Sequence, residues 1–364
     1  MANWKSAQLK WTLTWDADWV TAVEFLTDQH VVAGNNLGQM MSWDFTNSDK
    51  TGKTAPPPTR LLVGHQNSVT RIRKLPGSST FFSSSFDHSI QTWSADSPTN
   101  GKQQITLNAT AIADAEARKR NGAKVPPPIT AEVSLQQSVG KMTGHTDWIA
   151  DFAISADGKN MLSGDDGNQV IWWDLATQKE LHRWKLKGWA YAIAISPDKK
   201  TALISERIPR VFDSGSRNAV GLWEMSSGKL MKDLSPDFKM YIASAVFSPD
   251  GKSLYLGQGG EANGKLFRLE LEGGKKPQEL SPAHQYGVTD FALDPTGKLF
   301  ASAGRDTVVR IWDVASGKML AELGKPRGGQ FKDWIHAVSF SPNGQMLAAA
   351  DMAGAVQIWE AGKN

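Results

Sequence analysis

Six tryptophans each end a short run of apolar residues, and their spacing limits the fold more than any other feature of the 364-residue chain. They are Trp43, Trp93, Trp173, Trp223, Trp312 and Trp359, which lie 50, 80, 50, 89 and 47 residues apart. The interval of 89 divides into 44 and 45 if Phe267 stands where another tryptophan would be expected. A period in the forties predicts that one structural unit is repeated seven times.

Each unit contains about four short apolar runs separated by turns. The turns after the first run are rich in Pro, Asp, Asn and Gly, which tight hairpins need. They lie at 155–159, 196–200, 248–252, 294–298 and 341–345. Short antiparallel strands with this period predict an all-β fold, a seven-bladed β-propeller of four-stranded antiparallel blades. A single blade cannot bury both of its faces, so we expect one domain over residues 1–364.

The N-terminus is expected to close the ring. Residues 8–15 alternate apolar and polar side chains, as one half-buried strand does. Only five residues follow Trp359, too few for a further strand. We therefore predict that residues 8–15 form the outer strand of the last blade.

The interval of 80 residues indicates an insertion in blade two, at about 94–130, between the third and fourth strands. Within it, residues 109–120 are rich in helix formers and end in the basic cluster 118–120. Residues 134–145 are expected to resume the outer strand of blade two. The insertion is either a docking arm that carries a basic helix or a solvated, mobile loop.

The composition excludes several classes of function. Without any cysteine, the chain can form neither a disulfide nor a thiolate zinc site, and its seven histidines lack metal-binding spacing, so we expect no metal and no cofactor. The net charge is only +3, with Lys and Arg scattered over turns, which does not favour nucleic acid as a partner. No stretch approaches the roughly 18 apolar residues of a membrane span, and the N-terminus does not read as a secretion signal. We expect a cytoplasmic protein with no membrane partner.

Two blades contain the residue types of a nucleophilic triad. These are His65, Ser83 and Asp87 in blade two, and His284, Ser302 and Asp306 in blade six. Gly64-His65 and Trp173-Asp174, with similar pairs in other blades, resemble the WD-repeat β-propeller family. That resemblance implies that each set joins Trp93 or Trp312 in a structural hydrogen-bond tetrad, so no catalytic residue is expected. Blades four and five depart from the family pattern because they lack the histidine.

The position just before the first strand of each blade carries an aromatic residue in five of the seven blades. These residues are Trp19, Trp148, Trp189, Tyr241 and Trp334; Ser68 and Gly287 occupy the other two positions. Two residues after this position come Tyr191 in blade four and His336 in blade seven. By the family resemblance, both positions surround the narrow end of the central channel. The alternative is that these rings pack between blades and are covered.

Further side chains are expected at the same mouth. Phe86 and Arg305 each precede a tetrad aspartate, while Arg207 and Arg210 lie on a long turn of blade four. Aromatic and cationic groups together favour an extended peptide with acidic and apolar side chains.

These observations predict a non-catalytic scaffold that binds a partner protein or peptide at the aromatic mouth. One alternative is an enzyme or small-ligand binder that uses His336, Asp151 and Asp290 in the channel. Another is a ribonucleoprotein component that uses the basic cluster of the insertion. Residues 259–265 match the spacing of a phosphate-binding loop, but Leu266 stands where Ser or Thr is needed and a strand is expected next, so a glycine-rich turn is the better interpretation.

Overall fold

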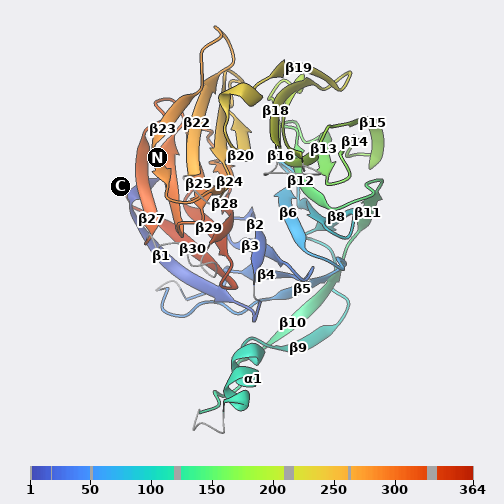
Figure 1. Cartoon of the computed structure of the whole chain (residues 1–364). Helices are drawn as coiled ribbons and strands as arrows, with labels where there is room; N and C mark the ends of the chain where they lie inside the picture. The colour runs from blue at the N-terminus through green and yellow to red at the C-terminus, as the bar shows by residue number, and fades with distance from the viewer. Residues whose placement is uncertain are drawn as a thin grey trace.

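The computed structural model describes residues 2–17, 19–49, 52–118, 124–208, 217–260, 264–325 and 334–363. Seven sheets stand radially around one axis as the blades of a propeller (Figure 1). Blade one contains β2 (Val20–Thr27), β3 (His30–Asn35), β4 (Met40–Asp44) and β5 (Arg60–Val63). Blade two contains β6 (Val69–Lys74), β7 (Thr80–Ser85), β8 (Ser89–Ser94) and β11 (Gly140–Thr143). Blade three contains β12 (Ile149–Ile154), β13 (Asn160–Asp165), β14 (Gln169–Asp174) and β15 (Lys179–Lys185).

The other four blades follow the same order. Blade four contains β16 (Trp189–Ile195), β17 (Thr201–Ile208), β18 (Arg217–Glu224) and β19 (Lys229–Asp233), followed by the short 3-10 helix η2 (Ser235–Asp237). Blade five contains β20 (Ile242–Phe247), β21 (Ser253–Gln258), β22 (Gly264–Glu270) and β23 (Gln278–His284). Blade six contains β24 (Val288–Leu293), β25 (Leu299–Gly304), β26 (Val308–Asp313) and β27 (Met319–Gly324). Blade seven contains β28 (Ile335–Phe340), β29 (Met346–Asp351), β30 (Ala355–Gly362) and β1 (Asn3–Thr14).

The innermost strands contact their neighbours in a closed circle, from β2 through β6, β12, β16, β20, β24 and β28 back to β2. A separate hydrophobic core fills the space between each pair of adjacent blades. Trp43, Trp93 and Trp312 are among the largest fully buried side chains. The repeated tryptophan therefore packs between blades, which explains why its spacing predicted the ring. The predicted seven-bladed all-β fold is confirmed.

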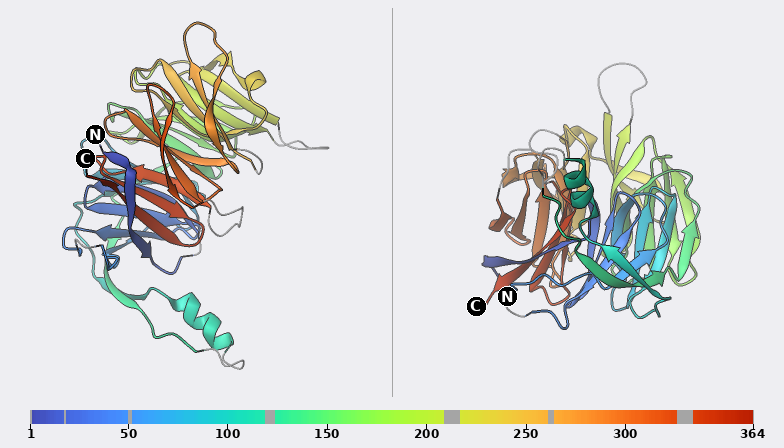
Figure 2. Two further views of the ribbon diagram at one scale, coloured as in Figure 1. Left: turned by 90° about the vertical axis from the view of Figure 1, so that its left-hand side faces the viewer. Right: turned by 90° about the horizontal axis from the view of Figure 1, so that it is seen from below.

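Strand β1 closes the ring as predicted, although it begins at Asn3 rather than near residue 8. It pairs antiparallel with β30, so both chain ends lie in one sheet and close together (Figures 1 and 2). Its buried side chains pack on both sides of blade seven. Trp4 joins the core toward blade six, and Trp11 and Leu13, together with Trp15 just after the strand, join the core toward blade one. This burial, together with the ladder, holds the first and last segments of the chain together.

The insertion does not stay within blade two. Strands β9 (Lys102–Thr106) and β10 (Thr130–Gln137) pair with each other, and β10 then runs parallel to β5 at the outer edge of blade one. The sheet of blade one thus has six strands in the order β2-β3-β4-β5-β10-β9. Residues 134–137 were expected in the outer strand of blade two, and this expectation was wrong, since that strand is β11. Val133, fully buried against the core of blade one, explains the attachment.

Helix α1 (Ala109–Ala117) lies at the far end of this arm and extends away from the ring (Figure 2). None of its residues is buried. The first turn is held by the Asp16 carboxylate, which accepts a hydrogen bond from the Thr110 backbone N–H. Of the predicted basic cluster, Arg118 follows the helix and residues 119–120 lie outside the described residues.

Candidate functional site

Two blades contain the complete hydrogen-bond chain that the sequence suggested. In blade six, His284 Nδ1 lies 2.8 Å from an Asp306 carboxylate oxygen and Nε2 lies 2.8 Å from Ser302 Oγ. Trp312 Nε1 donates to the same Ser302 Oγ at 2.9 Å. His65, Ser83, Asp87 and Trp93 form the same chain in blade two. Since Ser302 and His284 are fully buried, this serine lies beyond the reach of a substrate, and the chain ties the loop before the first strand to the turn after the second.

Burial and pairing also set the titration of this group. Burial lowers the pKa of His284, although the Asp306 carboxylate partly opposes the effect. The pKa of Asp306 falls to about 2, because its hydrogen bond to His284 and the charges around it outweigh the opposing effect of burial. His284 is therefore neutral near pH 7 and shares its aspartate with Arg310, whose Nη1 donates to Asp306 at 3.0 Å.

Blade three has a third chain of this kind, which the sequence analysis missed. His145 Nδ1 lies 2.8 Å from Asp165, and Ser163 Oγ accepts from Trp173 Nε1 at 2.8 Å. The aspartate here follows the serine by two residues, whereas Asp87 follows Ser83 by four. A search for a fixed spacing excludes this blade, although Gly144-His145 and Trp173-Asp174 were visible in the sequence.

The mouth of the channel is built by a feature that all seven blades share. Each first strand has a bulge near its beginning, for example between Val20 and Ala22 in blade one. We call the residue just before the first strand of each blade the mouth position. Among the described residues, the carbonyl of the mouth position accepts a hydrogen bond in six blades from the backbone N–H of the residue that follows the second strand. Two rings of side chains therefore frame the opening. In blade four β17 continues instead, and Arg207 pairs with Trp189 within the ladder.

The second ring fills the gaps in the first. Ser68 and Gly287 are the two small residues at the mouth position, and Phe86 and Arg305 are joined to their carbonyls. Phe86 lies on the ring of Trp148 in the next blade, with centroids 4.6 Å apart and planes 18° apart. In the same way, Arg305 Cζ lies 4.3 Å from the ring centre of Trp334 in the next blade. The small residues thus leave room for a stack that bridges two blades.

The part of the mouth that blades one to three contribute is open and carries exposed aromatic rings. Trp19 and Trp148 are each 45% exposed, and Phe86 is partly buried beneath Trp148. Most tryptophans in this fold are covered, so two tryptophans with nearly half their surface in water at one end of the channel are unusual. We name Trp19, Phe86 and Trp148 the open aromatic surface.

The part that blades four to seven contribute is more enclosed. Tyr241 is buried and Tyr191 partly buried, with their rings 4.6 Å apart in an edge-to-face contact. Arg207 Cζ lies 5.8 Å from the Tyr241 ring centre. A Cβ atom at Gly259 would lie 2.3 Å from this ring, so the glycine makes room for the tyrosine. The glycine-rich segment at 259–265 therefore serves packing at residue 259, and a strand follows it from Gly264 as expected.

Three more predicted residues complete this enclosed part. Trp189, Trp334 and His336 are partly buried. Burial and the nearby charge of Arg305 lower the pKa of His336 to about 4, so its ring is neutral at pH 7. Arg210 lies outside the described residues. The structure thus brings the described members of the predicted set to one end of the channel, on both sides of the opening.

Asp166 is a member of the second ring that the sequence analysis did not identify. Its backbone N–H donates to the carbonyl of Trp148 at 2.9 Å. Burial, Asp147 and Asp165 raise the pKa of its carboxyl to about 6, while Arg207 opposes this shift. The signal in the sequence was its position immediately after Asp165, one residue beyond the second strand.

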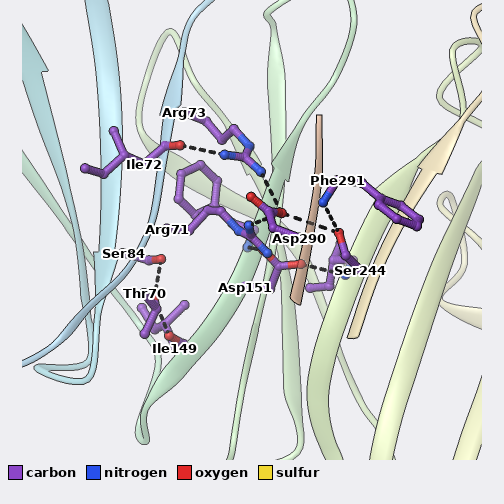
Figure 3. A network of polar contacts seen from close by, with 12 residues as sticks. Thr70, Arg71, Ile72, Arg73, Ser84, Ile149, Asp151, Ser244, Asp290 and Phe291 are labelled. Carbon is purple, nitrogen blue, oxygen red and sulfur yellow. Dashed lines mark hydrogen bonds and ion pairs between the residues drawn. The ribbon is translucent and has the colours of Figure 1, made fainter. Parts of the chain in front are cut away.

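Below the mouth, an ion-pair network crosses the channel (Figure 3). Arg71 Nε donates to Asp151 at 2.7 Å and its Nη1 donates to Asp290 at 2.7 Å. Asp151 also accepts from the backbone N–H of Ile193, and Asp290 from that of Val338. These bonds join blades two, three, four, six and seven, and Ser244 Oγ of blade five donates to Asp290 at 3.4 Å. Asp151 and Asp290 are thus occupied by internal partners, while His336 lies at the mouth.

A cavity of about 570 Å³ extends from this network toward the other end of the channel, with Arg71 and Asp151 in its lining. Glu24, Arg73, Lys74 and Ser244 contribute polar groups to its lining. Burial raises the pKa of Glu24 despite the opposing charge of Arg73. Throughout the described ranges, no group of three or more His, Asp or Glu side chains is placed to hold a metal ion. Nor does the described part of the chain contain a helix long and apolar enough to span a membrane.

Comparison with known families identifies the repeat. A family model described as WD domain, G-beta repeat matches residues 56–94, 136–174, 274–313 and 324–360. The matches fall on blades two, three, six and seven, and the three other blades complete the same ring. The chain belongs to the WD-repeat β-propeller family. Blades four and five of this WD-repeat propeller, which lack the tetrad histidine, are among the unmatched ones.

Individual relatives are also WD-repeat proteins. Small ribosomal subunit protein RACK1y of Oryza sativa subsp. japonica is 27% identical over 302 residues, which are 82% of this chain and 80% of that protein. The Striatin homolog of Dictyostelium discoideum is 20% identical over 363 residues, 94% of this chain and 40% of that protein. Autophagy-related protein 16 of Arabidopsis thaliana is 23% identical over 217 residues, 59% of this chain and 40% of that protein.

Proposed function

We propose that this propeller is a non-catalytic scaffold of the cytoplasm that binds an extended segment of a partner protein across its mouth. The observation that carries the proposal is the open aromatic surface, where Trp19 and Trp148 each leave 45% of their surface exposed. Tryptophan is enriched among the residues that dominate binding energy at interfaces. The absence of cysteine supports the reducing compartment.

The geometry of the opening supports an extended segment rather than a small ligand at this face. The open aromatic surface and the enclosed part with Tyr191, Arg305 and Trp334 lie on different sides of one opening, formed by different blades. A ligand that reaches both needs apolar groups for one and polar groups for the other. A few consecutive residues of a polypeptide provide both.

The test is affinity purification from the native cell with a tagged wild-type chain beside the double variant Trp19→Ala, Trp148→Ala. The control is Leu181→Ala, Leu230→Ala, which removes two exposed apolar residues, 54% and 46% exposed, from the outer strands of blades three and four. Each hot-spot tryptophan contributes about 2 kcal/mol or more, roughly a 30-fold change in affinity. We expect at least one partner to be lost with the tryptophan variant and kept with the control. An identical set of partners from all three proteins would contradict the proposal.

A second candidate function is a small-ligand site in the channel, which the 570 Å³ cavity favours. Its size lies within the range of small-molecule sites, and Glu24, Arg73 and Lys74 provide charged groups. Native mass spectrometry of the chain purified under mild conditions tests this function. A bound small molecule that is absent from Arg73→Ala would support it.

A ribonucleoprotein role for the arm remains a prediction. The relative from Oryza sativa is named as a small ribosomal subunit protein, and the arm carries Arg118 at its exposed end. Deleting residues 100–125 should then abolish a salt-dependent association with ribosomal particles. Retained association after the deletion would exclude the arm as the attachment point.

A further inference from the structure

Arg305 is a partly buried cation that forms no ion pair with any described carboxylate. Its guanidinium lies over the Trp334 ring, and among the described residues its one hydrogen-bond acceptor is the carbonyl of Gly260, at 3.5 Å. The buried Nε atom has no partner there. By contrast, Arg71 and Arg310 each bind carboxylates. These are the two other arginines discussed above whose burial is comparable or greater. A buried charge without an anion is uncommon in a folded protein, because burial removes its hydration.

A second unpaired group lies close to Arg305. Nε2 of His336 is buried and has no hydrogen-bond partner among the described residues. The charge of Arg305 acts on this ring and on the Tyr191 hydroxyl. Two polar side chains from adjacent blades therefore share one region of the mouth, and each has a buried nitrogen, Arg305 Nε and His336 Nε2, without a hydrogen-bond partner among the described residues. Burial removes the hydrogen bonds that such groups make to water, and a bound ligand group would replace them.

The described residues do not supply that acceptor. The charge of Asp290 acts on His336, but its oxygens bind Arg71, Ser244 and the backbone N–H of Val338. Asp166 belongs to blade three, and the cation that acts on it is Arg207. The charge of Arg207 is thus partly balanced by Asp166, whereas no described carboxylate balances the charge of Arg305.

We propose that the enclosed part of the mouth binds the carboxylate of an acidic side chain, Asp or Glu, in the partner segment, with Arg305 as the cation and His336 as the second donor. This inference rests on the proposed function and specifies the chemistry of its ligand. A planar guanidinium matches a carboxylate with two parallel hydrogen bonds. Trp334 holds the guanidinium plane from one side, so less side-chain freedom is lost on binding.

The charge of the site favours a monoanion over a phosphoryl group. His336 is neutral at pH 7, and the charge of Arg207 is partly balanced by Asp166, so Arg305 is the cation in this part of the described mouth that no carboxylate balances. A carboxylate balances one cation, while a phosphoryl group carries a charge of about −1.5 to −2 and pairs with clusters of arginines. Buried Tyr241 and partly buried Tyr191 leave an apolar wall for the methylene groups of the acidic side chain.

The experiment uses four libraries of seven-residue peptides with one fixed central residue. The other positions exclude Asp, Glu, Lys and Arg. Three libraries have amidated ends and carry Glu, Gln or phosphoserine at the centre, and the fourth carries Gln with a free terminal carboxylate. Each is passed over the immobilised full chain, and retained peptides are quantified by mass spectrometry. We expect the Glu library to be retained at least tenfold more than the amidated Gln library.

The variants locate the effect. Arg305→Gln should reduce the preference for Glu to less than twofold, and His336→Gln should reduce it in part. Arg305→Lys keeps the charge but not the planar pair of donors, so it should keep a smaller preference. Arg183→Gln, on the outer strand β15, should behave like the wild type. Each variant is used only if its melting temperature stays within about 3 °C of the wild type.

Equal retention of the Glu and amidated Gln libraries by the wild type would overturn this inference alone. So would a preference that survives Arg305→Gln, or stronger retention of the phosphoserine or free-end library. Retention of no library above bare resin would instead contradict the proposed function as well, since no peptide would then bind the mouth.

Discussion

Replacing Arg71 with Met should reveal how strongly the channel network holds the blades together. Arg71 binds Asp151 and Asp290 at 2.7 Å each, and the side chains of the two acids are 5% and 0% exposed. The two carboxylates hold the pKa of Arg71 well above its usual value. Methionine keeps most of the aliphatic stem and removes the charge. The variant therefore leaves buried Asp151 without its cation, and leaves Asp290 with the longer contact to Arg73 at 3.7 Å.

The expected loss follows from these contacts. Two hydrogen bonds between charged groups contribute about 1.5–3 kcal/mol each, and removing one partner of a buried ion pair costs about 3–5 kcal/mol. We therefore expect the free energy of unfolding to fall by about 4 kcal/mol. With an unfolding entropy of about 2.1 cal/mol/K per residue, the melting temperature of this chain should fall by about 5 °C.

The assay is urea unfolding at pH 7, followed by tryptophan fluorescence. Arg73→Met is the matched control, since Arg73 lies on the same strand but is 26% exposed and approaches Glu24 and Asp290 only at 3.8 and 3.7 Å. It should cost about 1 kcal/mol or less. Arg71→Met with Asp290→Asn should be more stable than Arg71→Met alone, because one unpaired charge is removed. Equal losses for Arg71→Met and Arg73→Met would refute the reasoning.

Three further predictions concern other parts of the ring. Ser302→Ala removes two buried hydrogen bonds, to His284 and Trp312, and should lower the free energy of unfolding by about 2–3 kcal/mol. A fluorophosphonate probe should label neither the wild type nor this variant, and labelling of Ser302 would contradict its structural role. Deleting residues 1–15 removes the buried side chains of Trp4, Trp11, Leu13 and Trp15 and exposes the edge of β30. The melting temperature should therefore fall sharply, or the chain should fail to fold. An unchanged melting temperature would disprove closure of the ring by this strand. The pKa of His336 is lowered to about 4, so the unfolded chain takes up this proton first as the pH falls, and stability should decline between pH 6.5 and pH 4 by up to roughly 3 kcal/mol. His336→Gln should lack this part of the decline in urea titrations, and parallel curves for the two proteins would show that His336 is not the group responsible.

The ring could be predicted because its period is written in the residues that fill the cores between blades. Trp93 and Trp312 are fully buried, and turns such as 248–252 have glycine at the one position with positive φ, here Gly251 at 71°. In blade four, Lys199 stands at the equivalent position and adopts a φ of 61°. The hairpin is therefore preserved there although the glycine is replaced by lysine. Local chemistry repeated at a fixed interval is sufficient to define the blades.

The path of the insertion could not be predicted, because strand pairing across blades has no signal in the period. The alternation that buries Ala131 and Val133 indicates a strand, but it does not say which sheet edge the strand joins. The parallel pairing of β10 with β5 depends on which edge lay within reach. A rule drawn from the repeat placed residues 134–137 in blade two for this reason.

The members of the mouth were predictable as a set, whereas their exposure was not. Trp148 and Tyr241 occupy the same position in two blades, yet one is 45% and the other 8% exposed. The difference in exposure comes from residues that are distant in the sequence. Gly259 makes room for the Tyr241 ring, whereas the Trp148 ring stacks on Phe86. Such contacts between adjacent blades are set by the assembled ring.

Site-specific photocrosslinking in the native cell tests the central claim most directly. A benzophenone amino acid replaces Trp148 in one protein and Leu230, on the outer strand of blade four, in another. The account predicts that position 148 yields a discrete adduct with an extended segment of a partner, mapped by mass spectrometry, and that position 230 does not. An adduct of the same partner from position 230 with none from position 148 would contradict the account.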